Sequence, residues 1–331
     1  MKTLIVGAGA LGGTIAARLR ACGADVALAV RNVESAELLK GSGLQLTGIG
    51  GAASIEPPDV RVAPLEHYFA GEFDLIVLAT KAKDAIDIAP TATRLLREGA
   101  TLLPIQNGGV SPLLAKRLGD DVVLGGLSHI GATMVAPGVY EQRNAGYLLI
   151  GEIGGGRSRR AEIVRDSLRG IDARITTNFA GAIWSKLLLN CSVTTIGAVA
   201  GSTMREYIVL PSGRELFDLV YDETLRVALE IGASPEPMIV DPIPPAGDAR
   251  DGWVADIAQA YGGAKPSMLQ DIERGRPTEI DFVNGYVVTC GREAGVETPA
   301  NAAIVAVIRA ITRGELAPSP TLLDRIVRSI R

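Results

Sequence analysis

The first turn of the chain constrains its fold more than any other feature does. Residues 4–12 read Leu-Ile-Val-Gly-Ala-Gly-Ala-Leu-Gly, a short aliphatic run that enters three glycines spaced as G-x-G-x-x-G. In a strand–turn–helix unit, Gly7 permits the tight turn, Gly9 lets a phosphate approach the backbone, and Gly12 lets the helix pack on the strand. A turn without a ligand also favours glycines, but the flanking strand and helix make dinucleotide binding the better interpretation.

Short apolar runs alternate with helical stretches through the first 150 residues. We expect strands at Thr3–Val6, Val26–Val30, Leu75–Ala79, Thr101–Ile105 and Val122–Leu124. Such alternation predicts right-handed βαβ crossovers on a parallel sheet of the Rossmann type. Farther on, Val139–Tyr140 and Tyr147–Ile150 are expected to form an antiparallel pair that closes the sheet, and Arg174–Thr177 to form a last short strand.

The second half of the chain has a different pattern. Long helical periods cover Ala182–Ala200, Gly213–Ile231 and Phe282–Ala294, and Ser234–Asp251, with its five prolines, is expected to be a loop. We therefore expect an α/β protein with an N-terminal Rossmann-type parallel-sheet domain in residues 1–175 and an all-helical C-terminal domain in residues 176–331.

Composition excludes several classes of function. The chain has 331 residues and a net charge of -4, so it offers no basic surface to a nucleic acid. We find no apolar span long enough to cross a bilayer and no cleavable signal, which indicates a cytoplasmic protein without a membrane partner. Cys22, Cys191 and Cys290 are too far apart in sequence to suggest a disulfide framework or a zinc site.

The residue after the second expected strand indicates which dinucleotide is bound. A site for NAD usually carries an acidic residue there, whereas Arg31 suits the 2′-phosphate of NADP. Lys81 follows the strand Leu75–Ala79 and adds a second positive charge at the same edge of the sheet. Either cation is also compatible with a plain exposed side chain, and the nearby Asp84 carries a charge that opposes a phosphate.

A polar stripe runs along an otherwise apolar helix in the second half. Lys186, Asn190 and Thr194 are spaced at i, i+4 and i+8 and so share one face. An unpaired ammonium on a buried helix is costly, so the stripe implies a partner or a substrate, and a dry environment lowers the pKa of the lysine. A lysine that extends its ammonium out of a core helix explains the pattern equally well.

Other polar residues are candidates for the same site. Asn107 follows the strand Thr101–Ile105, although Asn-Gly is also a common turn dipeptide. Ser267 is a substrate ligand or a helix cap, and Glu279 and Asp281 lie where a first helical turn favours acids for electrostatic reasons alone. His129 remains a minor candidate for a catalytic acid.

Three motifs together resemble the ketopantoate reductase (2-dehydropantoate 2-reductase) family. They are W-x-K-x-x-x-N at Trp184, Lys186 and Asn190, S-M-x-x-D at Ser267–Asp271, and T-E-I-D at Thr278–Asp281. The resemblance covers essentially the whole chain. It implies that NADPH delivers hydride to C2 of a 2-oxo acid, with a small molecule as the partner. A homodimer is a possible assembly, because helical second domains often dimerise.

The resemblance also implies roles for individual residues. Lys186 would be the general acid that protonates the 2-oxo oxygen, and Glu279 would orient the lysine or the substrate hydroxyl. The substrate would be bound by Asn107, Asn190, Thr194 and Ser267, and the cofactor by Gly7, Gly9, Ala10, Leu11, Gly12, Arg31, Lys81 and Asn107.

Thr194 departs from the pattern of the family, which usually carries a second asparagine there. A shorter hydroxyl in place of an amide alters one substrate contact. Reduction of a different 2-oxo acid therefore stays open, as does a regulator that senses NADPH without turnover.

Overall fold

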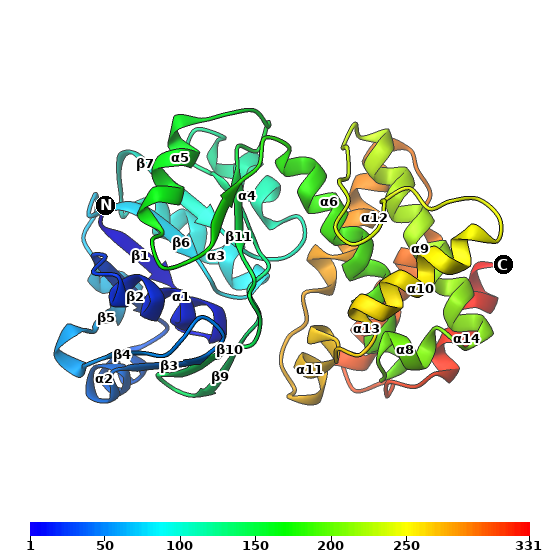
Figure 1. Ribbon diagram of the computed structural model, residues 1–331, viewed down its shortest axis with the longest axis horizontal. Helices are drawn as coiled ribbons and strands as arrows, with labels where there is room; N and C mark the ends of the chain where they lie inside the picture. The colour runs from blue at the N-terminus through cyan, green and yellow to red at the C-terminus, as the bar shows by residue number, and fades with distance from the viewer. The chain divides into compact units, whose positions relative to one another are not determined.

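The computed structural model describes residues 1–331 and divides them into two units, Met1–Phe179 and Ala180–Arg331 (Figure 1). The sequence places the division after residue 175, inside the last expected strand, whereas the structure places it after Phe179, the first residue of the next helix.

A five-stranded parallel sheet forms the centre of the first unit. Its order is β5-β2-β1-β6-β7, with β1 at Thr3–Val6, β2 at Val26–Val30, β5 at Arg61–Pro64, β6 at Phe73–Leu78 and β7 at Leu96–Pro104. Ile5 of β1 lies opposite Leu28 on one side and Val77 on the other, and all three side chains are buried. Near-continuous apolar strands of this kind are typical of a parallel sheet that is covered on both faces.

The four strands expected in this sheet are confirmed within a few residues, but the fifth expectation is wrong. Val122–Leu124 forms no strand, and Val123 makes a single bridge with Leu102. The sheet gains β5 instead, which pairs with β2.

The prediction of an antiparallel pair between Val139–Tyr140 and Tyr147–Ile150 is also wrong. The two runs belong to different sheets, one of order β4-β3-β10-β9 and one of order β12-β11-β8. Their strands are β3 Leu44–Gly48, β4 Ala53–Ile55, β8 Gly125–Ser128, β9 Ala132–Ala136, β10 Val139–Gln142, β11 Leu148–Gly151 and β12 Ala173–Ile175.

A tight turn elsewhere explains the different pairing. Pro137-Gly138 joins β9 to β10, and Gly138 has φ +79°, which a hairpin turn requires and side-chain-bearing residues rarely adopt. Between β10 and β11 the Asn144 side chain accepts hydrogen bonds from the backbone of Gly131 and Gly146, and it donates to His129. β10 therefore pairs with β9, whereas β11 pairs with β8, the strand that precedes β9 in the chain.

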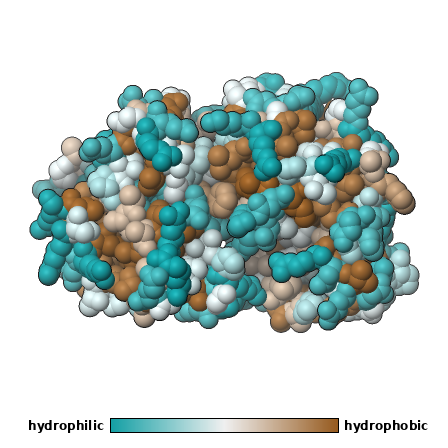
Figure 2. Space-filling view, turned by 180° about the vertical axis from the view of Figure 1, so that it is seen from behind, coloured by the Kyte–Doolittle hydropathy of each residue, from teal (hydrophilic) through white to brown (hydrophobic).

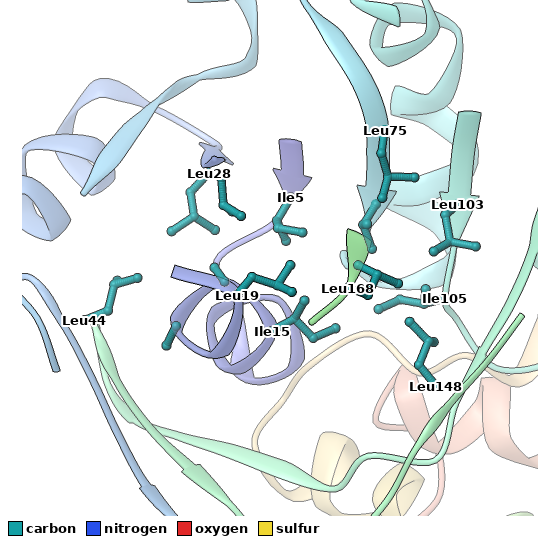
Figure 3. Packing of buried hydrophobic residues seen from close by; sticks show 14 of the residues in the cluster. Ile5, Ile15, Leu19, Leu28, Leu44, Leu75, Leu103, Ile105, Leu148 and Leu168 are labelled. Carbon is teal, nitrogen blue, oxygen red and sulfur yellow. The ribbon is translucent and has the colours of Figure 1, made fainter. Parts of the chain in front are cut away.

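Helix α1 lies between the parallel sheet and the four-stranded sheet. A Cβ added at Gly13 would come within 2.0 Å of the Tyr140 ring on β10, so only glycine lets the ring lie on the helix. Ile15 and Leu19 of α1 belong to the core shown in Figure 3, which also contains Ile5 and Leu28. The helices of this unit are α1 Ala10–Ala21, α2 Val33–Ser42, α3 Ala82–Thr93, α4 Val110–Leu118 and α5 Arg159–Ser167, with 3-10 turns η1 Pro57–Asp59 and η2 Leu65–His67.

The second unit contains helices and no strands, as expected. Its elements are α6 Phe179–Leu189, the π-helical turn η3 Asn190–Thr194, α7 Thr195–Ala200, α8 Met204–Tyr207, α9 Pro211–Glu230, α10 Ala249–Tyr261, α11 Ser267–Glu273, the 3-10 turn η4 Ile280–Phe282, α12 Asn284–Ala294, α13 Pro299–Thr312 and α14 Thr321–Ile330. The proline-rich stretch is a loop up to residue 248, where α10 follows.

One helix is long and apolar enough to cross a membrane, contrary to the expectation from the sequence. It runs through α6, η3 and α7 as Phe179–Ala200, and 83% of its most apolar window is buried inside the structure. It packs against α9, α11, α13 and α14, which accounts for its composition as that of a core helix.

Large apolar side chains on the surface are scattered. The most exposed are Phe69, Val135, Val209 and Ile243, which lie in four separate segments. Figure 2 likewise shows hydrophobic and hydrophilic residues interspersed over the face that it draws. Isolated residues of this kind are normal on a protein surface.

Candidate active site

Two of the three motif glycines are required by the backbone, and the third leaves an open space. Gly7 has φ +102°, and a Cβ there would lie 2.8 Å from Cγ2 of Thr80. A Cβ at Gly12 would lie 1.9 Å from the carbonyl oxygen of Gly7. At Gly9 a Cβ would meet nothing within 4 Å. The turn is therefore tight where it meets β6 and α1, and open at the position that a pyrophosphate approaches.

The N-terminus of α1 suits an anion. The helix begins at Ala10, no side chain caps it, and its first turn holds no acidic residue. Gly9 is exposed, and Ala10 and Leu11 are partly exposed. The free N–H groups of this turn, together with the positive end of the helix dipole, favour a phosphate.

Two buried oxygens without a partner lie at the carboxyl edge of the parallel sheet. Gln106 follows β7, and its Nε2 donates to the carbonyl oxygens of Leu78, at 2.7 Å, and Thr80, at 3.0 Å. These two bonds fix the orientation of the amide and leave Oε1 as a buried acceptor, and the hydroxyl of Thr80 is also buried without a partner. Where the chain offers no partner, buried polar atoms of this kind bond to ordered water or to a ligand. Together with the space at Gly9, they fit a bound dinucleotide.

The sequence did not single out Gln106 or Tyr140. The signal for Gln106 was its place beside Asn107 at the end of a strand. Tyr140 lies far from the glycine turn in sequence, yet its Oη donates to the carbonyl oxygen of Ala8 at 3.1 Å. Burial raises the pKa of Tyr140 to about 12, so its hydroxyl stays protonated and supports the turn over the ordinary pH range.

The two cations expected at the adenosine end are both exposed. Arg31 follows β2, and Nη2 of its guanidinium lies 4.0 Å from Oδ2 of Asp84. The side chains of Arg31 and Asp84 are 86% and 55% exposed. Lys81 precedes α3 at the N-cap position and is also exposed. The carboxylate of Asp84 therefore lies beside one of the groups that would hold a 2′-phosphate.

Asn107 lies in a bend between β7 and α4 and is partly buried. The next residue, Gly108, has φ +72°, so the Asn-Gly pair does form a turn. The turn puts the amide at the carboxyl edge of the sheet, beside Gln106. The structure is therefore compatible with both interpretations of Asn107, as part of a turn and as a ligand of cofactor or substrate.

The polar stripe is the accessible face of the central helix of the second unit. Among residues 181–200, all are buried except Lys186, Asn190 and Thr194. The i, i+4, i+8 spacing thus corresponds to one exposed face on a helix whose other sides form the core.

Lys186 and Glu279 interact electrostatically, and both are partly buried. Burial lowers the pKa of Lys186 to about 8, and the opposing influence of the Glu279 carboxylate is smaller. The downward direction expected from the sequence is confirmed. At neutral pH this ammonium is charged yet can give up its proton readily.

The structure decides two local points in this region. Ser267 is the first residue of α11, and Pro266 occupies the cap position, so the alternative of a cap is excluded. Glu279 caps the 3-10 turn η4 and Asp281 lies in its first turn, so the expected helical position holds for a 3-10 turn that ends before α12 starts at Asn284. Asp281 forms an exposed ion pair with Arg309 at 2.7 Å.

Ser267 and His129 have different surroundings. Ser267 is exposed, and its helix α11 contacts both η3 and α7. The turn η3 contains Asn190 and Thr194 of the polar stripe, and α7 follows it. The ring of His129 stacks on Tyr147, with the ring centroids 4.4 Å apart. Its position in this stack favours a structural contribution.

The chain matches two family models that together cover most of it. Residues 3–155 match the model of Ketopantoate reductase PanE/ApbA, and residues 178–312 match that of Ketopantoate reductase PanE/ApbA C terminal. A 2-dehydropantoate 2-reductase of Pyrococcus abyssi (strain GE5 / Orsay) is 31% identical over 306 residues, which are 91% of this chain and 94% of that protein.

Solved structures have the same fold. The crystal structure of 2-dehydropantoate 2-reductase from Geobacter metallireducens GS-15 has a TM-score of 0.79 and 26% identity, covering 93% of this chain and 99% of that chain. The ternary structure of D-mandelate dehydrogenase with NADH and anilino(oxo)acetate has a TM-score of 0.80 and 23% identity, covering 95% and 99%. Given the two family models, the relative at 31% identity and the shared fold, the chain belongs to the ketopantoate reductase PanE/ApbA family and is an oxidoreductase that acts on a CH–OH group with a nicotinamide cofactor.

Proposed function

We propose that this protein reduces 2-dehydropantoate to pantoate with NADPH, and that Lys186 is the general acid. The observation that carries the proposal is the ammonium of Lys186, which has a pKa of about 8, lies on the accessible stripe and interacts with the carboxylate of Glu279. The names of the relatives support this substrate, since the Pyrococcus abyssi protein is a 2-dehydropantoate 2-reductase.

The chemistry needs one proton at one oxygen. When bound, the nicotinamide supplies a hydride to C2 of the 2-oxo acid. The carbonyl π bond breaks, negative charge develops on the oxygen, and Nζ of Lys186 donates the proton that completes the alcohol. A positive charge next to the forming oxyanion also stabilises the transition state.

The surroundings of Lys186 suit this step. An ordinary lysine holds its proton too tightly to be an efficient acid near neutral pH, and burial removes much of that preference. Glu279 keeps the pKa from falling further, so the charged form still predominates at pH 7. The proton is then regained from solvent or from a neighbouring group after each turnover.

The remaining polar residues bind and orient the substrate. Asn190 and Thr194 offer an amide and a hydroxyl on the same accessible face as Lys186. Ser267 adds an exposed hydroxyl at the start of α11. In the first unit, Asn107 offers an amide at the carboxyl edge of the sheet. Polar groups of this kind bind the oxygens of the substrate and orient C2 for hydride transfer.

Arg31 and Lys81 are proposed to select NADPH over NADH. Arg31 is free to swing its guanidinium onto a 2′-phosphate, because 86% of its side chain is exposed and its contact with Asp84 is long. The carboxylate of Asp84 makes the preference weaker than the two cations alone would give.

The test is turnover by the purified protein, followed by the absorbance of NADPH. We expect oxidation of NADPH with 2-dehydropantoate at a higher kcat/KM than with other branched 2-oxo acids or with phenylglyoxylate, the oxo acid that corresponds to mandelate. A higher kcat/KM for another acid would replace the substrate but keep the reaction. Tight binding of NADPH without turnover of any acid would instead indicate a regulator and contradict the proposed function.

A further inference from the structure

The polar stripe contains a break in the regular helix. Residues Asn190–Thr194 form a π-helical turn, in which the N–H of Thr195 bonds to the carbonyl oxygen of Asn190, five residues back instead of four. The helix is α-helical on both sides of it, in α6 and α7. Single π turns inside α-helices lower the regularity of the hydrogen bonds and occur often at functional sites.

The turn changes the direction of Thr194. In a regular α-helix each residue advances by about 100°, so a residue eight positions on from Lys186 has rotated away from it by about 80°. A turn closed by i→i+5 bonds holds more residues, so each of them advances less. Residues 190–194 therefore bring Thr194 back toward the line of Lys186. This agrees with the burial of residues 181–200, of which Lys186, Asn190 and Thr194 are the three that are not fully buried.

The carbonyl oxygens in and beside the turn are bonded by side chains. The Oη of Tyr207 donates to the oxygen of Ser192 at 2.7 Å and lies 3.3 Å from that of Val193. Ser192 Oγ donates to Leu188 at 2.6 Å, and Thr195 Oγ1 donates to Cys191 at 2.5 Å. The last two bonds come from within the helix itself, so Tyr207 is the one of these donors that holds the turn from another element.

Tyr207 is held in place by its own surroundings. Its side chain is fully buried, and burial raises its pKa well above the ordinary value, so the hydroxyl stays a donor. It ends the short helix α8, which a capping box between Thr203 and Glu206 fixes at the start. A Cβ at Gly213 would lie 2.0 Å from the backbone oxygen of Tyr207, so α9 begins directly against it.

We propose that Tyr207 is a positioning residue for substrate: its hydroxyl holds the π turn that aligns Asn190 and Thr194 with Lys186. The inference rests on the proposed function, because it concerns the same site. It also gives Thr194 a specific place, as a substrate contact whose direction depends on a buried tyrosine behind it. Tyr207 itself does not touch the substrate.

The test compares two conservative variants. Tyr207→Phe removes one hydroxyl and keeps the ring, and Tyr221→Phe is its matched control, because Tyr221 is equally buried in the same unit and donates to the carbonyl oxygen of Pro242 at 3.0 Å. We expect Tyr207→Phe to raise KM for the 2-oxo acid about tenfold, roughly the value of one hydrogen bond, with KM for NADPH unchanged. Tyr221→Phe should change neither KM, although both variants lose similar stability.

A second comparison asks whether Tyr207 acts through the stripe. Thr194→Val removes the proposed substrate contact. If the tyrosine only orients that contact, the double variant Tyr207→Phe/Thr194→Val should raise KM by less than the product of the two single effects. In hydrogen exchange, the backbone amides of residues 190–196 should lose protection in Tyr207→Phe and keep it in Tyr221→Phe.

The outcomes separate the two proposals. An active wild type in which Tyr207→Phe and Tyr221→Phe have the same KM would overturn the positioning role and leave the proposed function intact. Fully multiplicative effects in the double variant would also overturn it. A wild type that reduces no 2-oxo acid would contradict the proposed function, and the positioning proposal with it.

Discussion

Lys186 is held where its charged form is less stable than it is in water. The lowered pKa of about 8 reflects that cost, since burial outweighs the attraction of Glu279. A fold selected for stability alone would place an apolar residue on this helix. The lysine is therefore better explained by chemistry than by packing, and two measurements follow from it.

The first measurement is the pH dependence of turnover. The general acid must be protonated, so kcat should fall as pH rises through about 8, by about tenfold per pH unit above it. Lys186→Ala should lose about a hundredfold or more of kcat and leave NADPH affinity nearly unchanged. Lys40→Ala is a suitable control, because Lys40 forms a surface ion pair with Glu37 at 2.8 Å. Equal activity of Lys186→Ala and wild type would exclude the acid role.

The second measurement is stability. The folded pKa of Lys186 lies below that of an unfolded lysine, so the unfolded chain binds more protons between the two values, and stability rises with pH across that window. Below it the buried charge destabilises the fold. Lys186→Met should therefore raise the free energy of unfolding at pH 7, by on the order of 1 kcal/mol, as measured by urea denaturation. A lower free energy of unfolding in the variant would show that the attraction of Glu279 outweighs the cost of burial.

In the first unit, we expect Asp84 to affect the choice between NADPH and NADH. Asp84→Asn removes a negative charge 4.0 Å from Arg31 and should raise the preference for NADPH over NADH about threefold, a small change because both groups are exposed. Arg31→Ala should reduce the preference for NADPH over NADH. Asp87→Asn serves as the control, since Asp87 pairs with Lys83 on the same helix. The readout is the ratio of kcat/KM values, and a ratio unaffected by Asp84→Asn would show that the carboxylate is too far from the phosphate.

At the scale of elements, the contact between α1 and β10 links the glycine turn to a second sheet. The ring of Tyr140 lies against Gly13, and its hydroxyl bonds to the turn at Ala8. Gly13→Ala would force the ring and the helix apart and should destabilise the protein by about 1–3 kcal/mol. The control Gly252→Ala lies at an exposed position of α10, where a Cβ meets nothing within 4 Å, and it should be neutral or stabilising. Equal denaturation midpoints for the two variants would refute the packing argument.

Periodicity located most elements and left their pairing open. The strands β1 and β2 agree with the sequence to the residue, because a buried parallel strand is a bounded apolar run. The partners of β10 and β11 were predicted wrongly, because pairing depends on which connection forms the tight turn. The sequence favours a turn at Gly138 and at Asn144 equally. The π turn was not predicted, since its donor Tyr207 acts from another helix.

For the whole molecule, the candidate residues divide between the two units. The glycine turn, Arg31, Lys81 and Asn107 lie in Met1–Phe179, and the polar stripe, Ser267 and Glu279 lie in Ala180–Arg331. Motifs close in sequence were recognisable in advance, whereas Gln106 and Tyr140 gain meaning only from their bonds to Leu78 and Ala8. Sequence spacing describes one element at a time, and these contacts join elements far apart in the chain.

This division predicts where the cofactor stabilises the protein. A ligand that binds the folded state at a hundredfold its Kd adds about 2.7 kcal/mol to the stability of whatever unfolds with the site. NADPH should therefore protect backbone amides of residues 1–179 from hydrogen exchange more than those of residues 180–331. Greater protection in residues 180–331 would move the main cofactor contacts to the helical unit.

The helix Phe179–Ala200 has a consequence for how the chain is made. Its apolar sides are sheltered partly by α14, which contacts α7 and begins only at Thr321. During synthesis this apolar segment therefore leaves the ribosome more than a hundred residues before α14, the last helix that packs against it. A chain that stops short of Thr321 should aggregate or stay bound to chaperones, because the helix that bears Lys186 would lack part of its cover.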